Sequence, residues 1–369
     1  MHVRKKSGGL DKTMLGIITL LLLAGLIVLA SASFSLSEQK FGSPYYFLAR
    51  QMLFGLGIGS ILFMLALRIP IDWYARWSPF LLMGGIFLVL LVFIPGVGYS
   101  AGGAARWIVL GPLSFQPSEV LKLTFVIYLA SWMASKRKHV ASFALGFMPF
   151  LIITGFVSFF LILEPDIGTL GVIALTSLLL FFLGGGRPSQ ITATILLGVA
   201  VLAGVIYLEP YRRNRIFVFL NPGAETQGIG YQINQALIAI GSGGFWGRGW
   251  GLSRQKFQYL PEPAGDAIFA IFAEELGFIG AVILLGLFFV FFWRGMLIAG
   301  HAKDYFAKYL AAGITLLVIT QVIINIGAIS GILPLTGIPL PFVSYGGTAL
   351  AFLLFEMGIL LTISRRSSP

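Results

Sequence analysis

The sequence predicts an all-α protein that crosses a membrane many times. Hydrophobic residues make up 57% of the chain and charged residues 11%, with a mean hydropathy of +0.93, whereas a soluble domain carries about 25% charged residues. The apolar residues also occur in runs of about 20, the length that a helix needs to cross a hydrocarbon core of about 30 Å. A long polar stretch, 209–266, separates two of these runs. We therefore expect a single polytopic membrane domain over residues 1–369.

The apolar runs predict about ten membrane-spanning helices. The expected spans are 13–33, 46–67, 77–97, 117–135, 142–163, 167–183, 190–208, 267–293, 306–328 and 343–363. The first span follows Arg4-Lys5-Lys6, as a signal peptide would. Its apolar part is longer than the roughly 7–15 residues of a signal peptide, so we expect the helix to be retained.

Lysine and arginine decide the predicted orientation. The segments on the side of the N-terminus carry most of the 25 Lys and Arg residues, and the other side carries most of the 14 acidic residues. Cytoplasmic loops gather Lys and Arg, so both termini are expected in the cytoplasm of a bacterial cell. The stretch 209–266, between the seventh and eighth spans, is then extracellular. The net charge of +11 reflects this bias rather than binding of nucleic acid.

Several kinds of chemistry are excluded by composition. The chain has no cysteine, which excludes disulfides and thiolate chemistry. Its three histidines, His2, His139 and His301, fall near predicted cytoplasmic ends and do not suggest a metal site or a catalytic triad. Neither GxGxxG nor GxxxxGK[ST] occurs, so no nucleotide site is expected.

The stretch 209–266 is too long to be a plain connector. Its apolar part, 233–240, is too short to span a membrane. The stretch is either a cap with a half-buried helix or a lid or platform beside a site, and its aromatic residues argue against disorder. The glycine-rich run 241–251 is interpreted as a re-entrant turn with aromatic anchors at the membrane surface.

Candidate cations lie beside acidic residues. Glu119 and Lys122 are three residues apart at the start of the fourth span, on one face of a helix. They are either an ion pair that lowers the cost of charge in the membrane or a cation held ready for phosphate. Arg212, Arg213 and Arg215 form a short basic run, and arginine suits bidentate contacts with phosphate.

Asp266 is the strongest candidate for a catalytic carboxylate. It closes the polar stretch and leads directly into the span that begins at residue 267. We expect the helix dipole and nearby cations to favour its ionised form, as a general base requires, although a helix N-cap is the alternative. Glu164-Pro165-Asp166 is typical of a helix opening, and the prolines from Pro334 to Pro341 favour a cavity before the last span.

A set of stretches occurs in a fixed order along most of the chain, from about Tyr45 to Ser364. They are FLARQ (47–51), GAARW (103–107), SFQPSEVLK (114–122), LEPD (163–166), GYQINQALIAIGSGG (230–244), SRQK (253–256), AEELG (273–277) and GILPLTGIPLPFVSYGG (331–347). Together they resemble the SEDS family (shape, elongation, division and sporulation), the FtsW/RodA/SpoVE proteins. The stretch SRQK is more similar to the division and sporulation branch than to the elongation branch.

The resemblance implies a peptidoglycan glycosyltransferase that polymerises lipid II into glycan strands. It also implies a class B penicillin-binding protein as partner, besides other proteins of the division or elongation machinery. The essential aspartate of the family corresponds to Asp266. The family usually reads PEAHTDFIF around it, whereas this chain reads PEPAGDAIF over 261–269.

This activity agrees with the candidate residues. A lipid diphosphate donor brings its own leaving group, so the transfer needs a base and charge stabilisation. Asp266 is the expected base, and Glu119 is expected to orient Asp266 or Lys122. The expected diphosphate ligands are Arg50, Arg106, Lys122, Arg215 and Lys256. A divalent cation, Mg²⁺ or Mn²⁺, can share the work of these residues, although no dedicated ligand set is visible. A lipid II flippase and a non-catalytic scaffold of the division machinery remain as rival functions.

Overall fold

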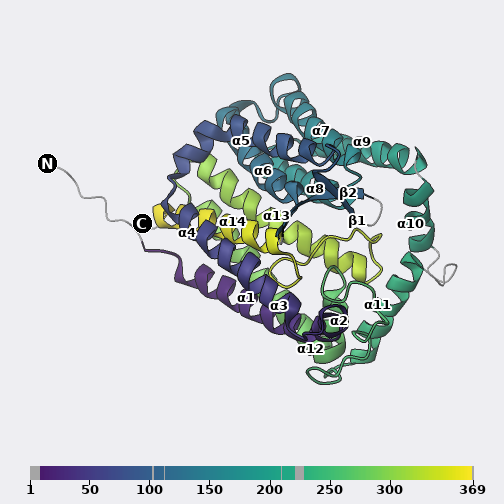
Figure 1. Ribbon diagram of the computed structural model, residues 1–369. Helices are drawn as coiled ribbons and strands as arrows, with labels where there is room; N and C mark the ends of the chain where they lie inside the picture. Colours follow the sequence, from purple (N-terminus) through teal and green to yellow (C-terminus); the bar gives the residue numbers. More distant parts are fainter. Residues whose placement is uncertain (1–8, 102–103, 112, 209, 221–227, 368–369) are drawn as a thin grey trace.

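The computed structural model describes residues 9–101, 104–111, 113–208, 210–220 and 228–367. The sequence features at Arg4-Lys5-Lys6, Gly103 and Glu209 lie outside these residues, as does the side chain of Arg212. Helices dominate the structure (Figure 1), which confirms the predicted all-α membrane fold.

Eight of the described helices are long and apolar enough to cross a membrane, as expected of an integral membrane protein. They are α1 (Lys12–Ala32), the continuous α3 (Tyr46–Arg50), η1 (Gln51–Gly57) and α4 (Ile58–Arg68), α5 (Ile71–Leu91), η3 (Phe143–Phe147) with α7 (Met148–Leu163), α9 (Pro188–Leu208), α12 (Ile268–Gly300), α13 (Tyr305–Ile329) and α14 (Gly347–Ser367). The remaining two predicted spans coincide with α6 (Pro117–Ser135) and the shorter apolar α8 (Ile167–Leu183).

The predicted span 77–97 was placed too late in the chain. The helix α5 begins at Ile71, directly after the extended Pro70, and ends at Leu91. Its first turns carry Asp72 and the exposed Trp73 and Trp77. Aromatic residues of this kind favour the membrane surface, so the helix starts in a polar zone that a search for apolar runs passes over.

A small antiparallel sheet was not predicted. Its strands β1 (Gly98–Ala101), β2 (Ala104–Leu110) and β3 (Leu113–Phe115) lie in the order β1-β2-β3 between α5 and α6. In the register, Ile108 lies opposite both Gly98 and Phe115. The strands are short and contain glycine and alanine, so the alternation of apolar and polar residues that reveals a strand is weak.

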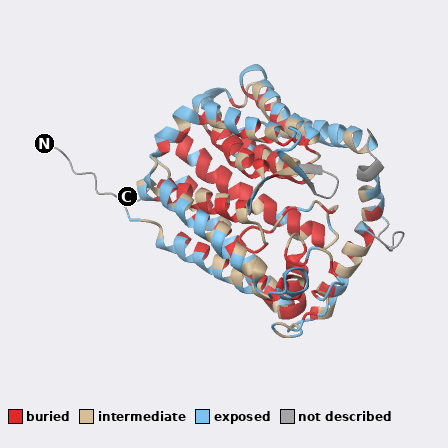
Figure 2. Ribbon diagram, in the orientation of Figure 1, coloured by how far each residue is buried: buried red, intermediate tan, exposed pale blue. Residues whose placement is uncertain are grey.

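The most buried helices are α13 and α14, as Figure 2 shows. The most apolar window of α13 is 83% buried and that of α14 is 78% buried, against 6% for α9. The helices α4 and α14 approach closely at Gly358, where an added Cβ would lie 2.7 Å from Ala66 Cβ. The centre of the bundle is therefore closely packed, while α9 leaves nearly all of its most apolar window exposed.

The polar stretch contains two helices, α10 (Pro210–Leu220) and α11 (Ile229–Gly243), which lie along one edge of the molecule (Figure 1). The apolar part 233–240, which one of the two interpretations made a half-buried helix, lies within α11. A glycine-rich turn follows and meets α12 at its kink, where Gly277 has a φ of 66°. Short α2 (Phe34–Phe41) and the 3₁₀ turn η2 (Arg137–His139) complete the described helices.

Four helices, α6, α8, α12 and α14, begin at the same end of the bundle, which we call the Asp266 end. The segment before α14 touches the segment before α12, because Tyr345 N donates to Ala264 O at 2.8 Å. The sheet reaches the same end through Thr348 Oγ1, which donates to Ser114 O at 2.8 Å. Residues far apart in the sequence thus meet around Asp266.

Candidate functional site

Asp266 lies between the turns that follow α11 and the first turn of α12, and it is half-buried. The N-cap of α12 is Ala267, and among the described residues no side chain makes a cap hydrogen bond there. The alternative in which Asp266 serves only as a helix cap is therefore wrong. The carboxylate instead points to groups from other elements.

The carboxylate of Asp266 faces three parts of the polar stretch and one loop. Its Oδ1 lies 3.4 Å from the donor Gln232 Nε2 on α11. Glu262 and Arg215 act on it electrostatically. Its Oδ2 faces Gly337, where an added Cβ would lie 3.9 Å away and where φ is 73°. Glycine suits this backbone conformation and leaves space beside the carboxylate.

The electrostatics of Asp266 differ from the expectation. Burial, together with the negative charge of Glu262, raises the pKa of Asp266 to about 6, because the opposing effects of Gln232 and Arg215 are smaller. We expected the helix dipole and cations to lower this pKa, and that expectation was wrong because desolvation dominates. A pKa near 6 leaves the group mostly ionised at neutral pH, close to the value that suits a general base.

Glu119 and Lys122 form a buried ion pair on α6. Lys122 Nζ lies 2.8 Å from Glu119 Oε1, and the two residues are 2% and 6% exposed. Glu119 also lines a cavity of about 20 Å³ together with Gln321 of α13 and Glu356 of α14. That volume holds about one water molecule. The cavity is also lined by Ser344, the residue whose Oγ donates to Gly265 O at 2.7 Å.

Arg106 of β2 lies beside the segment between α7 and α8. One of its terminal nitrogens donates to Pro165 O. Burial, together with the negative charge of Asp166, raises the pKa of Glu164 to about 9, although Arg106 has a smaller opposing effect. The predicted helix opening is confirmed, because Asp166 Oδ1 accepts from Thr169 N at 3.1 Å and caps α8.

Arg215 and Arg50 contact different elements. Arg215 Nη1 donates to Leu335 O at 2.8 Å, in the loop that faces Asp266. Arg50 stands over the ring of Tyr46, 5.7 Å from its centroid. It also borders a groove of about 220 Å³ whose walls are mostly apolar and include Phe54 and Phe352.

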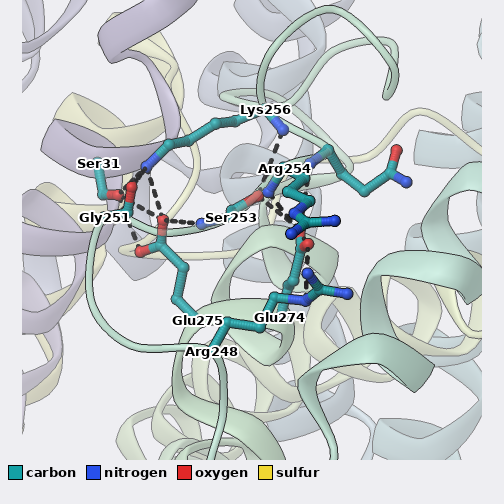
Figure 3. A network of polar contacts seen from close by, with 9 residues as sticks. Ser31, Arg248, Gly251, Ser253, Arg254, Lys256, Glu274 and Glu275 are labelled. Atoms are coloured by element: carbon teal, nitrogen blue, oxygen red, sulfur yellow. Dashed lines mark hydrogen bonds and ion pairs between the residues drawn. The ribbon is translucent and has the colours of Figure 1, made fainter.

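Lys256 belongs to a closed polar network (Figure 3). Its ammonium lies 2.8 Å from Glu275 Oε1, 3.0 Å from Ser31 Oγ and 2.7 Å from Gly251 O. An ammonium has three donors, and these three contacts use them all. The structure therefore assigns Lys256 to holding the loop after α11 against α1 and α12, which differs from its expected contact with diphosphate.

The neighbouring Glu274 completes this network. It accepts from Ser253 Oγ at 2.5 Å and from Arg254 N at 3.1 Å, and it pairs with Arg248 Nε at 3.4 Å. The backbone also joins the two segments, since Gly249 N donates to Glu275 O at 3.0 Å. The glycine-rich turn is thus fixed in place by charge pairs that the sequence analysis did not identify.

Two further residues at the site were missed. Gln232, the donor to Asp266, lies within a stretch that carried the family resemblance but received no role. Asn325 lies inside the apolar α13 and donates to Asp266 O at 2.8 Å. An amide within an apolar span is itself a signal, because polar groups at membrane depth are costly and usually functional.

Comparison with known proteins identifies the family. The sequence model of the FtsW/RodA/SpoVE cell cycle proteins matches residues 11–369. The chain is 44% identical to stage V sporulation protein E of Bacillus subtilis over 96% of its length and 97% of that protein. It is 42% identical to the probable peptidoglycan glycosyltransferase FtsW of Coxiella burnetii, over 94% of both chains.

Solved structures share the fold. A chain from a peptidoglycan synthase complex, reported for its coordination of polymerization and crosslinking, matches with a TM-score of 0.82 at 26% identity, over 97% of this chain and 98% of that one. The rod shape determining protein RodA of Thermus thermophilus matches with a TM-score of 0.72 at 25% identity, over 98% of both chains. The expected similarity to the sporulation and division proteins agrees with the higher identities to SpoVE and FtsW. The chain belongs to the FtsW/RodA/SpoVE family.

Proposed function

We propose that this protein is a peptidoglycan glycosyltransferase in which Asp266 is the general base. The observation that carries the proposal is a half-buried carboxylate with a pKa of about 6, held between α10, α11 and the loop before α14. Relatives that share most of the chain are named peptidoglycan glycosyltransferases. We propose lipid II as the substrate and the outer face of the cytoplasmic membrane as the place of reaction.

The chemistry follows from the linkage that is made. The donor sugar is α-linked to diphosphate and the glycan strand is β-linked, so the transfer inverts the anomeric carbon. Asp266 removes the proton from the acceptor 4-hydroxyl as its oxygen bonds to C1 of the donor. The bond from C1 to the diphosphate oxygen breaks, and the diphosphate leaves with the bonding electrons. Cations must then stabilise the leaving charge.

Arg106 and Arg215 are the cations that we assign to the diphosphate. Arg106 donates to Pro165 O and Arg215 donates to Leu335 O, both in loops at the Asp266 end. A guanidinium has its donors in a fixed plane, so these contacts orient both cations at that end of the bundle. Burial of Arg106 Nε, which has no hydrogen-bond partner among the described residues, supports a polar ligand there.

Arg50 suits the lipid end of the same substrate. It borders the apolar groove that α4 and α14 line together, and Tyr345 is a wall of that groove. Tyr345 also bonds through its main chain to Ala264, two residues before Asp266. We propose that a polyprenyl chain occupies the groove, with Arg50 at the rim of the groove and the headgroup of the lipid directed toward Asp266.

We propose that a divalent cation is bound jointly by the protein and the diphosphate of the substrate. Among the described residues, no group of three or more His, Cys, Asp or Glu side chains forms a metal site. Mg²⁺ commonly binds one or two carboxylates together with substrate phosphates. Glu262, which acts electrostatically on Asp266, offers one such carboxylate, and the diphosphate would provide further oxygens, so that Asp266 stays available to accept the proton.

We further propose that the protein works with a crosslinking partner, a class B penicillin-binding protein, and with other proteins of the division or elongation machinery. The similarity to a chain from a peptidoglycan synthase complex supports such an assembly. The exposed apolar faces of the spanning helices provide surfaces on which a transmembrane helix of the partner can pack.

The test is polymerisation of lipid II by the purified protein in detergent, with and without the partner. A glycosyltransferase forms glycan strands without two compartments, whereas a flippase or a scaffold does not. Asp266→Asn is expected to lower the rate by about 10²–10⁴ while the protein stays folded. Asp72→Asn is the matched control, because Asp72 is an exposed acid at the opposite end of the bundle. Wild-type turnover by Asp266→Asn would overturn the assignment.

A further inference from the structure

The main chain before α12 is held at three consecutive carbonyl groups. Ala264 O accepts from Tyr345 N at 2.8 Å, Gly265 O accepts from Ser344 Oγ at 2.7 Å, and Asp266 O accepts from Asn325 Nδ2 at 2.8 Å. We call Asn325, Ser344 and Tyr345 the carbonyl clamp. Loop segments commonly leave some main-chain carbonyls to water, so hydrogen bonds to three consecutive carbonyls restrict the backbone around Asp266.

Asn325 does more than hold Asp266. Its Nδ2 also donates to Ile338 O at 2.7 Å. That second carbonyl belongs to the loop in which Leu335 O accepts from Arg215. One amide nitrogen therefore joins the segment that carries the proposed base to the loop that anchors a proposed diphosphate cation.

The chemistry of this position requires a primary amide. The nitrogen of asparagine has two hydrogens and can donate to both carbonyls at once. Aspartate at neutral pH has only acceptors and would repel both, and leucine has neither donor nor acceptor. Asn325 is 2% exposed and comes from α13, the most buried of the candidate spans, so the amide is held on a rigid support.

We infer that Asn325 is a positioning residue that sets the distance between Asp266 and the diphosphate cation Arg215. The inference rests on the proposed function. Among the described residues, the hydrogen bonds of Asn325 go to main-chain carbonyls, so it acts through the placement of the two segments and does not touch the reacting atoms. Misplacement of a catalytic group by about 1 Å can lower a rate by about 10².

The test compares Asn325→Leu and Ser344→Ala with Thr315→Val in full-length protein, using lipid II in detergent. Thr315 is a matched control, because it is buried on the same helix, where its hydroxyl donates to Ala311 O at 2.8 Å. For each variant, kcat per folded molecule, KM and the melting temperature are measured.

Asn325→Leu is expected to lower kcat by about 10- to 100-fold while KM changes less than about threefold. Ser344→Ala, which loses one clamp contact, is expected to give a smaller fall in kcat, and it provides the answer if Asn325→Leu does not fold. Thr315→Val is expected to keep the wild-type kcat. A purely structural role would lower the melting temperature and leave kcat of the folded protein unchanged.

Wild-type kcat in the folded clamp variants overturns the inference, and so does a rise in KM without a fall in kcat. The proposed function fails separately. If Asp266→Asn is active, Asp266 is not the base, whatever the clamp variants do. If Asp266→Asn is inactive and the clamp variants keep the wild-type kcat, only the positioning role of Asn325 is wrong.

Discussion

Lys122 Nζ lies 2.8 Å from Glu119 Oε1 inside the bundle, where both side chains are buried. A buried charge that loses its partner typically costs about 3–5 kcal/mol. Of the two interpretations left open by the sequence, this geometry favours the ion pair. Glu356 borders the same cavity as Glu119, so loss of Lys122 would leave two carboxyl groups near one another.

We therefore expect Lys122→Met to lower the melting temperature in detergent strongly. Combining it with Glu119→Gln, which removes the orphaned charge, should restore much of the stability. KM for lipid II in this folded double variant then separates the two roles. An unchanged KM shows that Lys122 does not bind diphosphate. A KM raised tenfold or more would instead show that Lys122 contacts the substrate.

The pH dependence of kcat/KM tests the environment of Asp266. A base must be ionised, so activity is expected to fall as the pH drops through about 6, the pKa of Asp266. Glu262→Gln removes a charge that raises this pKa and should shift the acid limb to lower pH. Gln232→Leu removes a donor to the ionised form and should shift the limb to higher pH. Shifts in the same direction would contradict this account.

The stability of the protein should depend on Glu164. Its pKa of about 9 lies above the ordinary 4.5, so between these values the folded state holds a proton that the unfolded state has lost. Stability from this group therefore falls as pH rises, by up to about 1.4 kcal/mol per pH unit. Glu164→Gln should flatten that dependence in a melting series from pH 5 to 9. The exposed Glu38→Gln is the control, and an unchanged slope in Glu164→Gln would refute the assignment.

The orientation of the chain is open to a direct test. With both termini inside, a reporter fused after Arg366 should read cytoplasmic, and one inserted near Gln227 should read external. The structure does not describe Gln227, but α10 and α11 on either side of it lie at the Asp266 end. A cytoplasmic signal near Gln227 would place Asp266 on the wrong face for lipid-linked chemistry outside the cell.

The spans could be predicted because hydrophobicity along one helix is a local property. The expected spans 117–135 and 167–183 coincide with α6 and α8. Errors arose where the local signal was weak, as at the polar start of α5 and in the short strands around Arg106. The candidate Asp266 was found from its place at the end of a polar stretch, and Gln232 was missed because nothing in the sequence links α11 to that residue.

The sequence by itself determined the membrane class, the helical spans and the acidic and basic residues that a site can use, since these depend on composition and on neighbours along the chain. Only the tertiary structure decided how these charges are used. Burial raised the pKa of Asp266, whereas the sequence had suggested a lowered value. Lys256 forms contacts with Glu275 and Ser31 and therefore belongs to a structural network. Asn325 joins two segments because α13 places its amide beside two carbonyls that are distant in the sequence. Desolvation and hydrogen bonding between segments depend on three-dimensional packing, which no single stretch of sequence contains.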